Sequence, residues 1–364
     1  MHRTIALGDR ALIAIAAHVE VRTELRRSRA LMRRDLRDVL IGSYARKVAI
    51  WPGKDVDVFS RLMGETVESI SPDHAYELFG TALRSFDAQG RLVPQPRSYK
   101  VEFGPGRYPS VEAFNAAARD REWDQTRVSR VIAKLDRLEF EFAVDVVPAV
   151  RWDDRYGIPQ TARVGPDRAR HRTGAWHLTD PVSLTDETWA RNEKPRVAGV
   201  GAFVRTVKML KQIKAHHLRD TKPSGLYYEF ALHEGFVSGE IDGESWADIA
   251  ASALTYVATR LQRVDADPVC DPALNLAYQP APSHADLAHP QNLFDGLARR
   301  ARRAISTERR CQAAIEWRHI FGSNAEHDHV FRLPAGCRET GHEMGAAAAN
   351  VATGGTAERS FGDR

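Results

Sequence analysis

Apolar and polar positions alternate with two different periods in the first part of the chain. From Ile5 to about Arg34, apolar residues recur every three or four positions between arginines, which predicts an amphipathic helix. The pattern then shortens to the apolar run "DVLIG", which is typical of a strand that ends at a glycine. A helix followed by a strand is the simplest interpretation.

A period of two appears in two later stretches. In "KDVDVF", valines alternate with Asp55 and Asp57, and in "LEFEFAVDVV" apolar residues alternate with Glu139, Glu141, Ala143 and Asp145. Successive side chains of a strand point to opposite faces. Each stretch therefore predicts a strand that buries one face and shows carboxylates on the other.

The rest of the first half predicts a mixture of helices and strands. We expect a helix near His74 to Phe86 and strands near Ser98 to Phe103 and Ser129 to Leu135. The stretch "RYGIPQTARVGPDRARHRTG" is rich in proline, glycine and arginine, and such a composition indicates irregular chain. We therefore predict a domain boundary at about residue 160.

Helical periodicity dominates the second half, so we predict an α+β protein with a mixed first domain (1–160) and an all-helical second domain (161–333). The final segment, 334–364, is small, polar and rich in glycine and alanine, which predicts a disordered tail. The predicted helices are Val200 to His217, Ser224 to Glu234, Ser245 to Leu261 and Asn292 to Phe321.

Composition and charge narrow the class of protein only slightly. Among 364 residues, Lys plus Arg number 52 and Asp plus Glu 48, a mild excess that favours anionic partners without requiring a polyanion. The three cysteines, Cys270, Cys311 and Cys337, are scattered, so we expect neither a disulfide scaffold nor a thiolate zinc site. With no apolar run long enough for a membrane helix and no secretory pattern at the N-terminus, we expect a cytoplasmic protein without membrane contact.

The first candidate catalytic residues are the carboxylates of the two predicted strands with alternating apolar and polar residues. Asp55 and Asp57 lie on one face of their strand, and Asp145 from a neighbouring strand can converge on them. Hard carboxylate oxygens suit Mg²⁺ or Mn²⁺, and two such ions about 3.5–4 Å apart can clamp both the attacking and the leaving oxygen of a phosphoryl centre. These three aspartates are the predicted metal ligands.

A short turn precedes these carboxylates. Gly42 allows close backbone approach, and the backbone N–H groups together with the Ser43 hydroxyl are suited to phosphates. Taken alone, an Asp-x-Asp pair or a Gly-Ser turn is more often structural than catalytic. Their order and their company favour a nucleotide-binding enzyme.

The motifs "GSYARKVAI", "KDVDVF" and "FAVDVVPAV" together resemble the signature of DNA polymerase β-like nucleotidyltransferases. More narrowly, the chain is similar to the cGAS/DncV-like nucleotidyltransferases (CD-NTases) of bacterial CBASS anti-phage systems. The segments "LTDP", "FVRTVKMLKQIK", "KPSGLYYEF" and "WRHIFG" follow in that family's order, together with Asn192, so the resemblance spans about residues 8–333. Val48 departs from the threonine usual in the family, at a position that we expect to support the loop.

The resemblance implies a role for each matching residue. Gly42 and Ser43 would bind donor phosphates, Asp55 and Asp57 would ligate two metal ions, and Asp145 would help to activate the attacking hydroxyl. Lys208 and Ser224 match positions that contact the triphosphate, and Lys211 is a further candidate. Arg205, Lys208 and Lys211 recur every three residues, so a merely solvated helix face is the alternative interpretation.

The resemblance also implies the reaction and its setting. The chain would be a nucleotidyltransferase that makes a cyclic di- or trinucleotide from NTPs, ATP among them, in a cleft between the two domains. Its partners would be a downstream effector and, as a further candidate, a regulatory protein. Nucleic acid is not required as far as the sequence shows. Three alternatives remain open: a template-independent RNA or tRNA nucleotidyltransferase, a protein-modifying nucleotidyltransferase, and a non-catalytic nucleotide- or RNA-binding protein.

Overall fold

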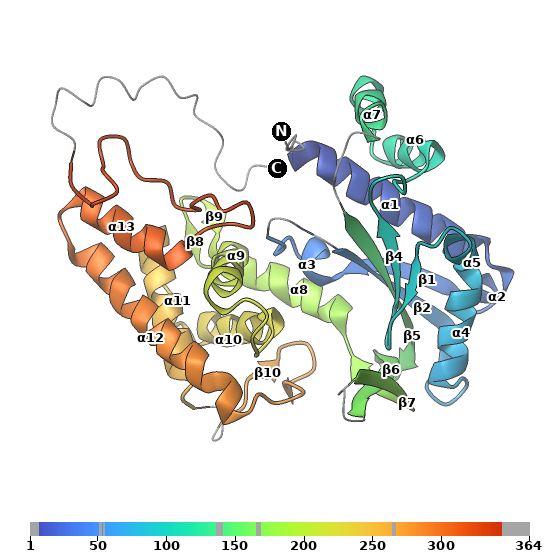
Figure 1. The fold of residues 1–364 in the computed structure, drawn as a ribbon. Coiled ribbons are helices and arrows are strands. Elements are labelled where there is room, and N and C mark those ends of the chain that lie inside the picture. Colours follow the sequence, from blue (N-terminus) through green and yellow to red (C-terminus); the bar gives the residue numbers. More distant parts are fainter. Residues whose placement is uncertain are drawn as a thin grey trace. The chain divides into compact units, whose positions relative to one another are not determined.

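The computed structural model describes residues 7–50, 53, 55–135, 141–164, 169–263 and 267–343. Its contacts divide the chain into two compact units, Met1–Asp186 and Glu187–Arg364 (Figure 1). We call them the first unit and the second unit. The boundary predicted at residue 160 thus falls inside the first unit.

A seven-stranded mixed sheet forms the centre of the first unit, counted over the described residues. The strand order is β1-β2-β5-β4-β3, and a hairpin of β6 and β7 continues from β5. Strands β2 and β5 run parallel, whereas β1–β2 and β4–β5 are antiparallel. The strands are β1 (Leu36–Ile41), β2 (Asp55–Thr66), β3 (Leu92–Pro94), β4 (Tyr99–Phe103), β5 (Phe142–Trp152), β6 (Arg155–Val164) and β7 (Ala169–Thr179).

Helices cover one face of this sheet (Figure 1). Leu25 of α1 and Phe79 of α4 are fully buried in one core cluster with Val56, Val58 and Val144 of the sheet. The alternation predicted for β2 is confirmed, since its valines are buried on this face. The helices are α1 (Leu7–Arg27), α2 (Arg29–Met32), α3 (Gly42–Ala45), α4 (Pro72–Ala82), α5 (Arg84–Asp87), α6 (Val111–Asp120) and α7 (Gln125–Ile132).

The stretch predicted as irregular chain is instead the β6–β7 hairpin. Proline and glycine suggested a break, but Pro159 pairs with Trp176 next to a register shift between Pro159 and Thr161. A β-bulge is one of the few places where a strand accepts proline, because the missing N–H is not needed there. The hairpin extends the sheet, which moves the boundary towards Asp186.

The strand predicted near Ser129 to Leu135 is also wrong, because this segment lies mostly in helix α7. Asp124 caps the helix by accepting a hydrogen bond from the Thr126 N–H at 2.9 Å. Val128 and Val131 are buried three positions apart, which is helical spacing. The capping aspartate was the local signal that outweighs the β-branched residues.

The second unit is helical, as predicted, but it also contains two short β ladders. The predicted helix from Asn292 to Phe321 is two helices, because Thr307 adopts extended backbone and ends the first one. No helix among the described residues is long and apolar enough to cross a membrane. The elements are α8 (Pro181–Asn192, which begins in the first unit), β8 (Arg196–Val197), β9 (Val200–Gly201), α9 (Ala202–Ile213), a π-helical turn (Lys214–Leu218), α10 (Gly225–Ser238), α11 (Trp246–Arg260), β10 (Cys270–Asp271), β11 (Leu276–Ala277), α12 (His284–Ser306) and α13 (Arg310–Phe321).

The second unit contains one disulfide, although the scattered cysteines predicted no disulfide scaffold. Cys311, at the start of α13, is bonded to Cys337, with the two Cα atoms 5.3 Å apart. The segment after Pro334 is therefore attached to α13, and the Arg338 N–H donates to the His342 carbonyl at 2.8 Å. Of the predicted tail, residues 334–343 are structured in this way, and residues 344–364 lie outside the described residues.

Candidate active site

Two parallel strands position the three predicted aspartates. The register pairs Asp57 of β2 with Asp145 of β5, and Asp55 with Ala143. Residues paired across neighbouring strands share a face, and so do residues two apart on one strand. All three carboxylates therefore lie on the face opposite the core, with Asp57 and Asp145 on strands about 4.8 Å apart.

The Gly-Ser turn lies against this carboxylate row. Strand β1 ends at Ile41, which pairs with Asp57, so Gly42 follows directly beside that aspartate. Gly42 has a φ of +71°, and a Cβ atom on it would lie 1.8 Å from Asp57 Oδ2. Only glycine fits here, because any side chain would clash with the carboxylate in a left-handed backbone conformation.

Backbone hydrogen bonds close the turn around Ser43. The Ser43 carbonyl accepts from the N–H groups of Val48 and Ala49 at 2.9 and 3.1 Å. The Val48 side chain is fully buried. This residue, where the family usually has threonine, therefore supports the loop from the inside.

Asp145 has a raised pKa. Burial, and then the nearby charge of Asp55, raise its pKa from 3.8 to about 6, while Lys100 acts in the opposite direction. Its Oδ1 atom is buried and accepts no hydrogen bond from any residue that the structure describes. A carboxylate oxygen in this state carries a free-energy penalty that a cation would relieve.

The donor set fits a divalent metal ion in its chemistry. Three carboxylates on one face, one with a buried oxygen that lacks a partner, are the hard ligands that Mg²⁺ and Mn²⁺ prefer. Within the described residues, no three His, Cys, Asp or Glu side chains stand close enough around one point to hold an ion as they are. Metal binding would therefore require the aspartate side chains to reorient, which their positions on neighbouring strands allow.

The second unit carries the other predicted residues on α9 and at the start of α10. Lys211 lies beside the N-terminus of α10, since a Cβ on Gly225 would lie 4.0 Å from its Cε atom. Ser224 is the N-cap residue of α10, and its hydroxyl lies 2.8 Å from the Tyr278 hydroxyl. Lys208 lies one turn earlier on α9.

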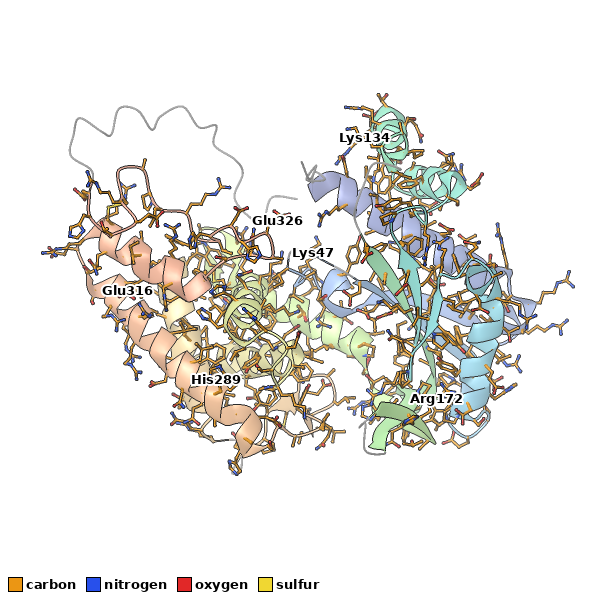
Figure 2. All side chains as sticks on the ribbon, viewed as in Figure 1. Lys47, Lys134, Arg172, His289, Glu316 and Glu326 are labelled. Atoms are coloured by element: carbon orange, nitrogen blue, oxygen red, sulfur yellow. A yellow bond between two sulfur atoms is a disulfide. The ribbon has the colours of Figure 1, made fainter. Side chains whose placement is uncertain are left out.

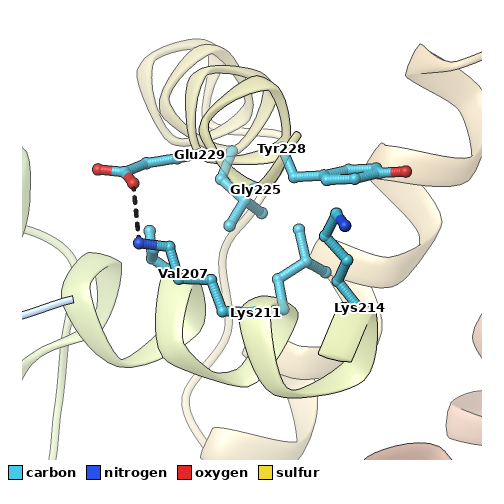
Figure 3. A pocket seen from close by; sticks show the side chains of 8 residues that line it. Val207, Lys211, Lys214, Gly225, Tyr228 and Glu229 are labelled. Carbon is cyan, nitrogen blue, oxygen red and sulfur yellow. Dashed lines mark ion pairs between the residues drawn. The ribbon is translucent and has the colours of Figure 1, made fainter. Parts of the chain in front are cut away.

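A small pocket between α9 and α10 contains the Lys211 side chain (Figure 3). Its Nζ atom lies 3.4 Å from Glu229 Oε2, and the Glu229 side chain is only 2% exposed. On the other side of the pocket, Lys214 donates to the Arg219 carbonyl at 2.7 Å, and burial lowers its pKa. A buried glutamate thus holds one of the two candidate lysines in place.

Sequence reasoning missed Glu229 and Lys100, for different reasons. Glu229 lies five residues after Ser224 in an apolar helix, and a buried acid in such a run could have been noticed. Lys100 alternates with apolar residues on a predicted strand and carries no local signal. Its place next to Asp145 depends on how the strands pair.

Comparisons with known proteins bear on the fold. No family model matches the sequence, and no curated protein matches it. Among solved structures, the chain has the fold of the CD-NTases, the cGAS/DncV-like nucleotidyltransferases. The mixed sheet of the first unit and the helices of the second therefore match these structures in fold.

Three of these structures define the likeness. Escherichia coli MS115-1 CdnC with ATP is 13% identical with a TM-score of 0.56, covering 87% of this chain and 92% of that one. Escherichia coli DncV in a 3′-deoxy GTP bound form is 14% identical with a TM-score of 0.55, covering 90% and 78%. Bradyrhizobium diazoefficiens CdnG in complex with GTP is 12% identical with a TM-score of 0.52, covering 82% and 91%.

Proposed function

We propose that this protein is a nucleotidyltransferase that makes a cyclic di- or trinucleotide from NTPs. The observation that carries the proposal is the carboxylate row of Asp55, Asp57 and Asp145 next to the Gly42 turn. All three residues lie in the sequence motifs, and the parallel register pairs Asp57 with Asp145. A Gly-Ser turn beside acidic metal ligands is suited to the phosphates of a nucleotide.

In the proposed reaction, a ribose hydroxyl of one nucleotide attacks the α-phosphorus of another. A new phosphorus–oxygen ester bond forms, the bond between the α-phosphorus and the bridging oxygen breaks, and pyrophosphate leaves. The hydroxyl proton passes to a base in the site, for which Asp145 is the candidate. A second transfer within the linear product closes the ring.

Each part of the site has a task in this proposal. The Gly42 and Ser43 backbone holds the donor phosphates, and Asp55, Asp57 and Asp145 would hold two Mg²⁺ or Mn²⁺ ions. The bound ions would supply Lewis-acid stabilisation of the charge on the transferred phosphoryl group.

The second unit would contribute cations and a helix N-terminus. The head of α10, with the Ser224 hydroxyl and Lys211 beside it, is suited to the triphosphate tail. Lys208 retains the same proposed role. That these residues and the aspartates serve one nucleotide in a cleft stays a prediction.

The biological setting follows from the family resemblance. Vibrio cholerae DncV is a cyclic AMP-GMP synthase, and CdnC forms a complex with a HORMA protein. We extend this to a cytoplasmic role in anti-phage signalling, in which the cyclic product reaches an effector and a regulatory protein controls the synthase.

The test is to incubate the purified protein with all four NTPs and Mg²⁺ or Mn²⁺, treat the mixture with phosphatase, and identify resistant products by mass spectrometry. The double variant Asp55→Ala/Asp57→Ala should lose at least about 100-fold of the activity. A matched control, Glu68→Ala/Asp154→Ala, removes two exposed carboxylates from the same unit and should retain it.

The outcomes separate the possible functions. A cyclic product that disappears only in the Asp55/Asp57 variant supports the proposal. Elongation of added RNA would favour an RNA or tRNA nucleotidyltransferase instead, and labelling of a protein would favour a protein-modifying enzyme. Nucleotide binding without pyrophosphate release would indicate a non-catalytic protein.

A further inference from the structure

Lys100 extends the carboxylate row by one strand. Strand β4 pairs antiparallel with β5, so that Lys100 lies opposite Asp145 and Glu102 lies opposite Ala143. Paired residues share a face. The order across three neighbouring strands is therefore Asp57, Asp145, Lys100, all on the face opposite the core.

The Lys100 ammonium is accessible and lies beside one acid. Its side chain is 36% exposed, and its Nζ atom lies 3.5 Å from Glu102 Oε1, on a side chain that is 41% exposed. Ion pairs this exposed contribute little to stability. The two side chains can therefore contact a ligand without a large loss of folding stability.

The Gly42 turn fixes the direction of the proposed reaction across this row. The turn lies against Asp57, on the side of β2 away from β5. If the turn holds the donor phosphates, the leaving pyrophosphate lies on that side. Because the attacking and leaving oxygens of a phosphoryl transfer stand roughly in line, the attacking hydroxyl approaches from the opposite side, over β5 and β4.

We propose that Lys100 contacts the acceptor nucleotide, with Glu102 as the residue that positions its ammonium. This inference rests on the proposed function. An acceptor that is itself an NTP carries phosphates and base carbonyl groups, which a lysine binds as a point charge with three N–H donors. The donor nucleotide, on the other side of Asp145, makes no contact with Lys100.

The experiment uses analogues that separate the two nucleotide roles in the full chain. A 2′,3′-dideoxy NTP has no attacking hydroxyl and acts only as donor, whereas an α,β-methylene NTP cannot release pyrophosphate and acts only as acceptor. Joining the two gives a linear product and pyrophosphate. The KM of each analogue is measured with the other at saturation, for the bases that the wild-type protein joins.

Lys100→Met should raise the KM of the acceptor analogue by about 10-fold or more, as expected for loss of a charged hydrogen bond. The KM of the donor analogue should stay within about 2-fold, and Lys100→Arg should recover part of the loss. Glu102→Gln should raise the acceptor KM by a smaller factor, about 2-fold to 5-fold. The control is Lys134→Met, which removes an exposed lysine after α7 in the same unit (labelled in Figure 2) and should change neither KM.

Three results would overturn the inference. An unchanged acceptor KM in Lys100→Met, or an equal rise in both KM values, would show that Lys100 does not select the acceptor, although the proposed function would stand. If the wild-type protein joins no pair of nucleotides, the proposed function is wrong, and this inference, which rests on it, is wrong as well. Circular dichroism of each variant establishes that the KM values come from folded protein.

Discussion

Asp145 is partly buried next to Asp55, and its pKa of about 6 has a consequence for stability. The folded protein holds a proton that the unfolded chain releases at a pH near 3.8, so this residue makes the fold less stable as the pH rises from about 4 to 6. Asp145→Asn removes the penalty. We expect it to stabilise the metal-free protein at pH 8 by about 1–2 kcal/mol, discounted for partial exposure, while abolishing nucleotidyl transfer.

Urea unfolding of wild type and Asp145→Asn at pH 4 and pH 8 measures this effect. The stability difference should be small at pH 4 and favour the variant at pH 8. A variant that is less stable than the wild type at pH 8 would show that Asp145 has a partner that offsets its charge.

Gly42 meets two separate demands, a φ of +71° and contact with Asp57 Oδ2. Gly42→Ala should lower the free energy of unfolding by about 2–4 kcal/mol and displace the Asp57 carboxylate, with a large loss of activity. Gly106→Ala is the matched control, because Gly106 has a φ of +70° but open space around its Cβ position. It should cost about 1 kcal/mol. Equal losses in the two variants would mean that the contact with Asp57 is unimportant.

At the level of elements, α9 and α10 are joined by the ion pair of Lys211 and the buried Glu229. Lys211→Met removes the cation that lies beside the buried Glu229 carboxylate, so we expect the second unit to lose about 2–4 kcal/mol of stability. The double variant Lys211→Met/Glu229→Gln should recover most of this loss, because no buried charge remains. Thermal unfolding of the three proteins measures the effect.

The stability of the double variant distinguishes a role of Lys211 in nucleotide binding from a role in folding. If the double variant is stable but still binds NTPs poorly, the lysine contributes to binding as well as to folding. If the double variant is as unstable as the single one, the packing of the lysine stem matters more than the charge.

The elements that the sequence predicted correctly are those with a strong local period. The valines and aspartates of β2 and the helical spacing of Val204, Val207 and Leu210 in α9 needed no information from elsewhere in the chain. The β6–β7 hairpin was not predicted because proline normally indicates a break, whereas Pro159 lies beside a register irregularity between the two strands. The segment that forms helix α7 was predicted as a strand, because we gave its β-branched residues more weight than the capping signal of Asp124.

For the whole molecule, the proposal requires that both units act on one nucleotide. A non-hydrolysable NTP with Mg²⁺ should then stabilise the wild-type chain by about 2.7 kcal/mol at a concentration 100-fold above its Kd. Asp55→Ala/Asp57→Ala in the first unit and Lys208→Ala in the second should each remove most of this gain. Differential scanning calorimetry with and without the nucleotide measures it. A gain that survives the change in one unit would assign nucleotide binding to the other unit alone.

The sequence by itself determined which side chains could do chemistry and which faces they share locally. Asp55 and Asp57 lie on one face because a strand has a period of two, and Gly42 precedes them wherever the strands pack. Tertiary structure alone decided which other distant residues became neighbours: Lys100 beside Asp145, Glu229 beside Lys211 and Cys337 beside Cys311. The physical reason is that strand register and helix packing are set by burial of apolar surface summed over distant segments, which no local window of sequence contains.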